Sequence, residues 1–376
     1  MQGITAEQKM WNFYDMKPGA PIFKKEFGFY VLDRWIQEGH LKVRDQVENY
    51  NSYLRSVFGL DGAAIYNLEG LGWCEAAFMP VFETKVLEDR GNHELVQDCA
   101  GRGVLYFKGR RSGFMPEYVS HPVTDQKSWE ENVVWRMDAS VPERMEAARS
   151  TSLAAKKARE RGKVIVQKAI GGYMYLRSLM GPEDLLYAFY DQPELIHLCM
   201  EKWLELSDAV IGEHQKNVDI DELFLAEDIC YNGGSLISPE MVREFLFPYY
   251  QQLIQNMKNR NGGRKLHVQM DTDGRAEDVV PLYQEIGMDY MSPFEVASGC
   301  DVVKIGAKYP ELRISGGIDK RMIVRGGDDL KRHLDYIMPA MRKRGGYIPT
   351  CDHGVPEETS FENYMLYRKL MDEYCG

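Results

Sequence analysis

Short apolar stretches in the second half of this chain end repeatedly in acidic residues, histidine or cysteine. The side chains that follow these stretches are, in chain order, Glu227, Asp228, Asp271, Glu295, Asp319, Cys351, Asp352 and His353. A helix-like segment comes after each stretch, which is the pattern of parallel strands joined by helices. Because the carboxyl ends of such strands meet on one face of a barrel, polar groups there form an active site. The pattern predicts an enzyme.

Three of the residue types in this region bind zinc. His267 lies inside a strand, Glu295 follows the next strand and Cys351 follows the last one. If they converge at the barrel mouth, imidazole, carboxylate and thiolate form a zinc site. Gln269 lies on the same strand face as His267, where it could orient a metal ligand or a substrate oxygen. The alternatives are a satisfied core histidine, a capping or ion-paired carboxylate and an inert thiol.

The carboxylates and the last histidine predict acid and base chemistry. Glu227 and Asp228 are adjacent, and two carboxylates whose surroundings separate their pKa values can divide the roles of acid and base. Asp271 is expected to face the cavity, and His353 beside Asp352 is a further acid/base candidate. The alternatives are a helix cap next to a solvent-facing carboxylate at Glu227 and Asp228, and a polar turn at His353.

Eight stretches have the composition of strands and would position these side chains. They are Ala63–Tyr66, Val104–Lys108, Val164–Lys168, Leu223–Ala226, Leu266–Gln269, Tyr290–Ser292, Leu312–Ser315 and Gly346–Pro349. Eight parallel strands that alternate with helices predict an α/β fold of the (β/α)8 TIM-barrel type, formed by residues 61–376.

Helices are expected before and between these strands. Residues 1–60 carry apolar residues at helical spacing, mainly in Phe27–Gly39 and Val43–Phe58, and predict an N-terminal helical cap on the barrel. Ser238–Pro239 is a helix start with a capping serine and proline at the first helical position. Pro248 is expected to kink that helix.

Composition excludes several classes of partner. The chain has 376 residues and a net charge of −11. It shows no basic stripe, so we expect no nucleic-acid partner. Apolar runs are shorter than the roughly 18 residues of a membrane span, and seven widely spaced cysteines form no disulfide framework. We therefore expect a cytoplasmic protein whose partner is a small molecule or another protein.

Several motifs resemble one superfamily. They are the run from Glu227 to Pro239, Asp271-Thr-Asp-Gly274, Pro293-Phe-Glu295-Val, Gly316-Gly-Ile-Asp319-Lys320 and Ile348-Pro-Thr-Cys351-Asp-His353-Gly-Val-Pro356. Residues 60–376 are similar to the uroporphyrinogen decarboxylase superfamily, and most closely to its corrinoid-dependent methyltransferases. The resemblance implies a (β/α)8 barrel. Related zinc methyltransferases hold the metal with His-x-Cys, a Glu and a distant Cys. His267, Glu295 and Cys351 occur in that order here, and Gln269 replaces the first Cys, so the presence of zinc stays open.

The resemblance implies transfer of a methyl group from a small O- or N-methyl donor, such as a methoxylated aromatic, to Co(I) of a corrinoid. The corrinoid would arrive on a separate protein, because this chain lacks an Asp-x-His-x-x-Gly signature. The poor leaving group would need a metal or a proton donor at the barrel mouth. Tyr66, Trp73 and Phe78 could form an apolar wall for the donor, with core packing as the alternative, and Asp319 is a candidate substrate contact.

Two other functions remain open. One is a cofactor-free decarboxylase, which would need cationic side chains in its pocket, although the arginine-rich stretch of uroporphyrinogen decarboxylases has no counterpart before Gly70. The other is a barrel without catalytic activity that serves as a binding protein. Assembly into a homodimer is also left open.

Overall fold

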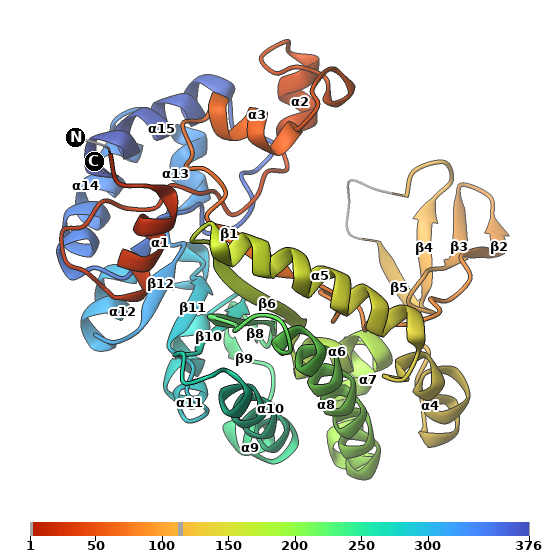
Figure 1. The fold of residues 1–376 in the computed structure, drawn as a ribbon. Coiled ribbons are helices and arrows are strands. Elements are labelled where there is room, and N and C mark those ends of the chain that lie inside the picture. The colour runs from red at the N-terminus through yellow and green to blue at the C-terminus, as the bar shows by residue number, and fades with distance from the viewer. Residues whose placement is uncertain (1–2, 112–115, 376) are drawn as a thin grey trace.

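The computed structural model describes residues 3–111 and 116–375, and its centre is a curled sheet of seven parallel strands. The strands are β1 (Ile65–Leu68), β6 (Val164–Ile170), β7 (Glu222–Ala226), β10 (His267–Thr272), β11 (Tyr290–Pro293), β12 (Arg313–Ser315) and β13 (Tyr347–Ile348). Their order in the sheet is their order in the chain, and every neighbouring pair is parallel (Figure 1). This is the winding of a TIM barrel, so the predicted fold type is confirmed, with seven strands in place of eight.

Helices cover the outside of the sheet (Figure 1). They are α5 (Pro142–Glu160), α6 (Gly172–Met180), α7 (Pro182–Asp191), α8 (Pro193–Gln215), α9 (Pro239–Phe245), α10 (Phe247–Arg260), α11 (Val280–Gln284), α12 (Val302–Lys308), α13 (Lys320–Arg325), α14 (Gly327–Arg344) and α15 (Phe361–Cys375). The hydroxyl of Ser238 accepts from the N–H of Met241, which confirms the predicted helix start. The chain then breaks at Leu246 between α9 and α10, just before Pro248.

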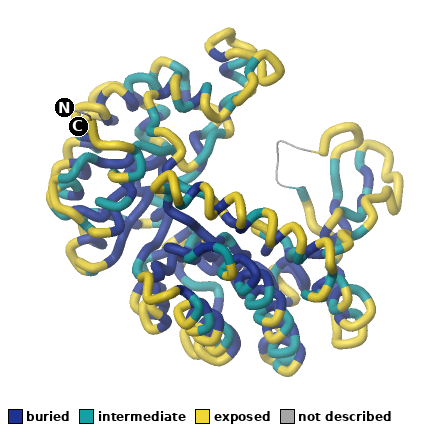
Figure 2. The backbone as a smooth tube through the Cα atoms, in the orientation of Figure 1, coloured by how far each residue is buried: buried dark blue, intermediate teal, exposed yellow. Residues whose placement is uncertain are grey.

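Alternation along the strands separates two apolar clusters. The outer cluster lies between sheet and helices and includes Leu223 and Leu225. The inner cluster lies in the barrel lumen and includes Phe224 and Ala226 of the same strand. Figure 2 shows the strands as buried, with exposed residues on the outer surfaces of the helices.

Helix α1 (Ala6–Tyr14) closes the end of the barrel where the strands begin. Its Met10, Phe13 and Tyr14 belong to the inner cluster. The Tyr14 hydroxyl donates to Glu222, the first residue of β7, at 2.5 Å. The Nε of Arg313, the first residue of β12, donates to the Tyr14 carbonyl at 2.7 Å. The opposite end, where the strands finish, is the barrel mouth.

The rest of the N-terminal region is helical only in part. The predicted helix over Phe27–Gly39 is shorter, as α2 (Leu32–Gln37), and the one over Val43–Phe58 is reduced to a short 3₁₀ turn, η1 (Arg44–Gln46), and α3 (Tyr50–Val57). Within the described parts of the chain, no helix is long and apolar enough to cross a membrane.

The predicted strand Val104–Lys108 does not belong to the barrel. It forms β4 of an antiparallel sheet that projects from the barrel (Figure 1). This sheet consists of β2 (Lys85–Arg90), β3 (His93–Gln97), β4 (Gly103–Phe107) and β5 (Glu117–Ser120) and is followed by α4 (Gln126–Asn132) and η2 (Val134–Met137). Since β4 pairs with β3 on one side and β5 on the other, both of its edges are occupied and it cannot join the parallel strands. The remaining short elements are the hairpin β8 (Cys230–Tyr231) and β9 (Gly234–Ser235), and the 3₁₀ turns η3 (Ala276–Val279) and η4 (Val296–Ser298).

An extended segment, residues 22–30, occupies the wall between β13 and β1. On the β1 side, the N–H of Lys24 donates to the Asp61 carboxylate at 2.7 Å, and the N–H of Asp61 donates to the Lys24 carbonyl at 2.8 Å. On the β13 side, the N–H of Val355 donates to the Gly28 carbonyl at 2.8 Å, and that of Tyr30 to the Val355 carbonyl at 2.9 Å. The segment thus stands in the place of an eighth strand.

Candidate active site at the barrel mouth

A chain of three polar side chains lines the lumen near the mouth. Gln269 and Asp271 lie on the inward face of β10, and Asp271 is the register partner of Ser292 on β11. The Gln269 amide donates to the Ser292 hydroxyl at 2.8 Å, and this hydroxyl donates in turn to Asp271 Oδ1. Gln269 therefore fixes the direction in which Ser292 donates and so orients the Asp271 carboxyl.

Asp271 can exchange a proton near neutral pH. Burial raises its pKa to about 7, against the opposing effect of the Ser292 hydrogen bond, and the nearby carboxylates of Asp273 and Asp228 raise it further. A general acid or base works best when its pKa lies near the working pH. Asp271 thus faces the lumen, and its role in catalysis stays a prediction.

An aromatic pair forms one wall of the mouth. The rings of Trp73 and Phe224 stack with centroids 5.1 Å apart and planes 9° apart. The ammonium of Lys168, which extends inward from β6, lies 5.1 Å from the centroid of the Trp73 ring. Trp73 remains 44% exposed, so part of its apolar surface is free to contact a ligand.

Two of the aromatic residues predicted for this wall lie elsewhere. Tyr66 packs against the outer cluster, and its neighbour Asn67 faces inward instead. A shift of one residue along a strand reverses the face, so the position of Tyr66 does not support the substrate contact predicted for it. Phe78 is buried in the outer cluster and meets Phe82 edge to face.

Lys25 adds a cation to the lumen. The predicted strands do not indicate this residue, because it lies on the extended segment 22–30. Its charge interacts with Glu222 and Asp271, which favour the ammonium form, and with Lys168, which disfavours it. Burial is the largest effect and lowers the pKa of Lys25. Lys25 and Lys168 together place two amines among the carboxylates of the lumen.

The adjacent acids Glu227 and Asp228 point to different regions. Glu227 faces the helices, where its two oxygens accept from the hydroxyls of Tyr250 at 2.6 Å and Tyr283 at 2.7 Å. Burial raises the pKa of Glu227 to about 7. Asp228 has a positive φ of 44° and turns toward the mouth, where it pairs with Arg177 at 2.6 Å. The structure therefore does not bring the two carboxylates to one substrate.

His267 lies at the closed end of the barrel, away from the mouth. Its Nδ1 is 2.7 Å from an Asp289 oxygen, and its ring stacks on Tyr14 with centroids 4.6 Å apart. The last residue of β10, Thr272, is five residues farther along, or roughly 16 Å at about 3.3 Å per residue. His267 is therefore a buried histidine that is hydrogen-bonded to Asp289 at the closed end of the barrel.

Glu295 and Cys351 lie beyond the strand ends but do not complete a metal site. Glu295 accepts from the Lys320 ammonium and from the N–H of Gly274, both at 2.9 Å. Cys351 is fully buried, and burial raises the pKa of its thiol. Across the described ranges, no group of three or more His, Cys, Asp or Glu side chains could hold a metal ion. His267, Glu295 and Cys351 do not converge, so these residues do not fit the zinc site predicted from them.

His353 lies on the rim of the mouth as part of a second polar group. Its Nε2 is 3.2 Å from an Asp273 oxygen and its Nδ1 is 3.3 Å from the Tyr30 hydroxyl. The hydrogen bond with Asp273 raises the pKa of His353. The neighbouring Asp352 accepts from the backbone N–H groups of Val296 and Lys320, and burial raises its pKa to about 6. His353 is therefore able to carry a proton at the rim.

Asp319 serves as a helix cap. It is buried, and its carboxylate accepts from the backbone N–H of Arg321 at 2.8 Å and from the Arg321 guanidinium at 2.8 Å. Because both oxygens are engaged at the start of α13, the substrate contact predicted for Asp319 is not supported by its position.

The mouth therefore combines an acid of near-neutral pKa, an aromatic wall and two amines. Residues of these types can bind a small aromatic or carboxylated molecule and deliver a proton to it.

Comparison with known proteins agrees with this architecture. Residues 112–374 match the family model of uroporphyrinogen decarboxylase (URO-D). The chain is 22% identical over 188 residues to uroporphyrinogen decarboxylase of Hydrogenovibrio crunogenus, which covers 49% of this chain and 50% of the relative. It is 24% identical over 182 residues to that of Hamiltonella defensa, covering 47% and 48%. The chain thus spans about half the length of the curated relatives it matches.

Among solved structures, a methyltransferase from Methanosarcina mazei has a similar fold. The TM-score is 0.60 with 13% sequence identity, and the superposition covers 100% of both chains. The family model covers more than half of the sequence, and the chain therefore belongs to the uroporphyrinogen decarboxylase (URO-D) family.

Proposed function

We propose that this protein transfers a methyl group from a small methylated donor, such as a methoxylated aromatic, to Co(I) of a corrinoid carried on a separate protein. The observation that carries the proposal is the Asp271 carboxyl, with a pKa of about 7, in a lumen walled by the stacked Trp73 and Phe224. The methyl–oxygen bond of the donor breaks, the methyl group leaves for the corrinoid and the oxygen takes the Asp271 proton.

Protonation is what this reaction requires of the protein. An alkoxide or phenolate is a poor leaving group, and a positioned acid contributes about two to four orders of magnitude in rate. Ser292 and Gln269 hold Asp271 in one orientation, and Trp73 offers a face on which an aromatic ring can stack. The corrinoid supplies the nucleophile when its carrier protein docks at the mouth. Since the predicted zinc ligands do not fit a metal, no step here depends on one.

The test compares the protein with an Asp271→Asn variant. Each is incubated with a reduced free corrinoid and a panel of methoxylated aromatics and methylamines, and corrinoid methylation is followed by absorbance. We expect a loss of about 10²- to 10⁴-fold in the variant. The parent rate should fall as the pH rises through about 7, because the acid must be protonated, and this limb should be missing in the variant.

A matched control is Asp328→Asn, the same change on an exposed carboxylate in the first turn of α14. It should retain the parent rate. If Asp271→Asn methylates the corrinoid as fast as the parent at every pH, Asp271 is not the proton donor. If the parent methylates no corrinoid with any donor, even with its cognate carrier protein, methyl transfer itself is refuted.

A decarboxylase is the second candidate, and the amines of Lys25 and Lys168 in the lumen favour it. They could bind a substrate carboxylate beside Asp271, and the curated relatives are decarboxylases by name. The carbon–carboxylate bond would break, CO₂ would leave, and Asp271 would protonate the remaining carbon. Release of CO₂ without any corrinoid, abolished by Lys168→Met, would establish this function in place of methyl transfer.

A further inference from the structure

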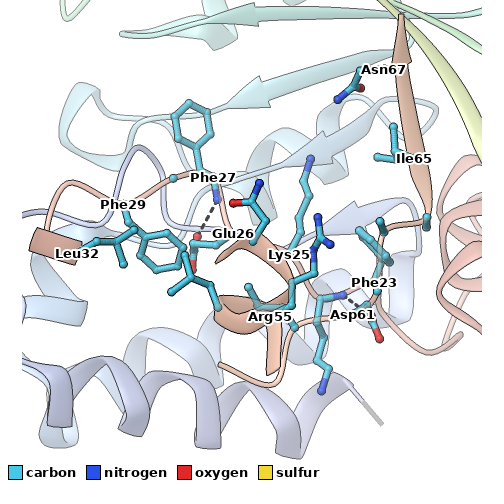
Figure 3. Close-up of a pocket in the computed structure, with 18 residues that line it drawn as sticks. Phe23, Lys25, Glu26, Phe27, Phe29, Leu32, Arg55, Asp61, Ile65 and Asn67 are labelled. Carbon is cyan, nitrogen blue, oxygen red and sulfur yellow. Dashed lines mark hydrogen bonds between the residues drawn. The ribbon is translucent and has the colours of Figure 1, made fainter. Parts of the chain in front are cut away.

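A cavity of about 460 Å³ opens in the barrel wall where the eighth strand is missing (Figure 3). One side is the extended segment 22–30, which contributes Phe23, Lys25 and Phe27. The other side is β1 with the chain before it, and helix α3 contributes Leu54 and Arg55. Inward-facing Asn67 of β1 also lines the cavity, which therefore lies beside the lumen.

The carboxylates that line this cavity are already engaged. Glu26 accepts from the N–H of Cys351 at 2.7 Å and from the Tyr364 hydroxyl at 3.0 Å, on the core side of the segment. Asp61 forms an ion pair with Lys9 at 2.9 Å and also accepts from the backbone of Lys24. Both carboxylates therefore already have other partners, although the charge of Glu26 also favours the ammonium form of Lys25.

Two of the cations that line the cavity have no such partner. Lys24 pairs with Asp372 at 2.8 Å. In contrast, neither the Lys25 ammonium nor the Arg55 guanidinium makes a hydrogen bond or an ion pair with any residue that the structure describes. Figure 3 shows both side chains among the residues that line the cavity. Partly buried cations are costly unless an anion or water satisfies them, so two such cations in the lining of one cavity favour an anionic ligand.

The other walls are apolar. Phe23 and Leu54 are buried, and Phe29, Leu32 and Ile65 complete the lining around the two cations. A ligand that fills the space must therefore present an apolar body together with its anionic end. A guanidinium presents a planar pair of N–H donors that matches a carboxylate, and one lysine supplies a second point charge.

We propose that this side cavity binds an organic carboxylate with an aromatic or aliphatic body, gripped by the Arg55 guanidinium with the Lys25 ammonium beside it. The inference does not depend on the reaction proposed for the mouth, because it concerns binding at a different opening of the barrel. The carboxylate ligand would reach Lys25 through the side cavity. Lys25 also interacts through its charge with Glu222 and Asp271 in the lumen.

Isothermal titration calorimetry of the full chain, without corrinoid, tests the inference. The probes are benzoate and phenylacetate as carboxylates, benzamide as the neutral counterpart of benzoate, and inorganic phosphate. We expect the carboxylates to bind and benzamide not to bind. Arg55→Gln should weaken carboxylate binding by about 10- to 100-fold, the usual effect of losing hydrogen bonds to a charged group.

Two further variants control for a general effect of charge and for loss of folding. Arg161→Gln makes the same change at an exposed position after α5 and should leave the Kd unchanged. Arg55→Lys keeps the charge but removes the fork and should give an intermediate Kd, which loss of folding would not produce. The proposal is overturned if no carboxylate binds, if benzamide or phosphate binds as tightly as benzoate, or if Arg55→Gln and Arg161→Gln have equal Kd values.

Discussion

Replacement of Glu227 by glutamine should remove a specific part of the pH dependence of stability. Glu227 is fully buried and accepts from two tyrosine hydroxyls, and burial raises its pKa from 4.5 to about 7. A glutamine has nearly the same shape but cannot ionise. The variant therefore separates the effect of the charge from that of packing.

The sign and size follow from linkage. Between pH 4.5 and 7 the folded protein holds a proton on Glu227 that the unfolded chain has lost, so the free energy of unfolding falls as the pH rises. The stabilisation is complete below the unfolded value and is lost above the folded one. At about 1.4 kcal/mol for each pH unit between the two values, the total is about 3 kcal/mol.

Urea unfolding at pH 5.5 and 8.5 measures this effect. Glu227→Gln should be less sensitive to pH than the parent: between these two pH values the parent should lose about 2 kcal/mol more of its free energy of unfolding than the variant, because about 1.5 of the 2.5 pH units lie inside this window. Glu285→Gln is the control, because its exposed carboxylate has a pKa held below the usual range by Arg243, and its titration lies outside the window. Parallel curves for Glu227→Gln and the parent would show that Glu227 is ionised in the folded protein throughout, which would refute the reasoning.

Two more substitutions test the positions of other predicted site residues. His267→Ala should lower the free energy of unfolding by about 2–4 kcal/mol, because it removes a buried ring that stacks on Tyr14 and bonds to Asp289, which keeps its contact with Arg313. The variant should keep the zinc content of the parent protein; a zinc loss measured by atomic absorption would contradict the core role. Trp73→Ala should raise KM for aromatic donors about 2- to 10-fold, because Trp73 stacks on Phe224 and offers a face to the donor. The urea midpoint should change little, because the Trp73 side chain is 44% exposed. An unchanged KM would show that Trp73 does not bind the donor.

The barrel could be predicted from the sequence because its signals are local and repeated. Stretches such as Leu223–Ala226 and Tyr290–Ser292 are buried on both faces and mostly apolar, as is typical of strands between a lumen and a helical layer. The helix start at Ser238–Pro239 was also predictable, because helix capping depends on a few adjacent residues.

The site was less predictable because it depends on where each strand begins and which face a residue takes. The zinc site predicted from the sequence requires His267 near the mouth, but His267 pairs in register with Glu222, the first residue of the neighbouring strand β7, at the closed end of the barrel. Tyr66 is predicted to contact the substrate, but the inward-facing residue is the next one along the strand, Asn67. Phe224 could have been found by counting alternate residues from the strand end, because inward and outward positions have a period of two.

Lys25 and Arg55 could not have been found in this way, and the reason is the missing strand. Had Val104–Lys108 joined the barrel, the parallel sheet would have contained the eight strands of a closed barrel. Because β4 pairs within the projecting sheet instead, the extended segment 22–30 closes part of the wall through backbone contacts to residues more than 300 positions away, such as Val355. Such contacts leave no periodic pattern in the sequence. The same departure from eight strands thus accounts both for the failure of the prediction and for the charged cavity beside the lumen.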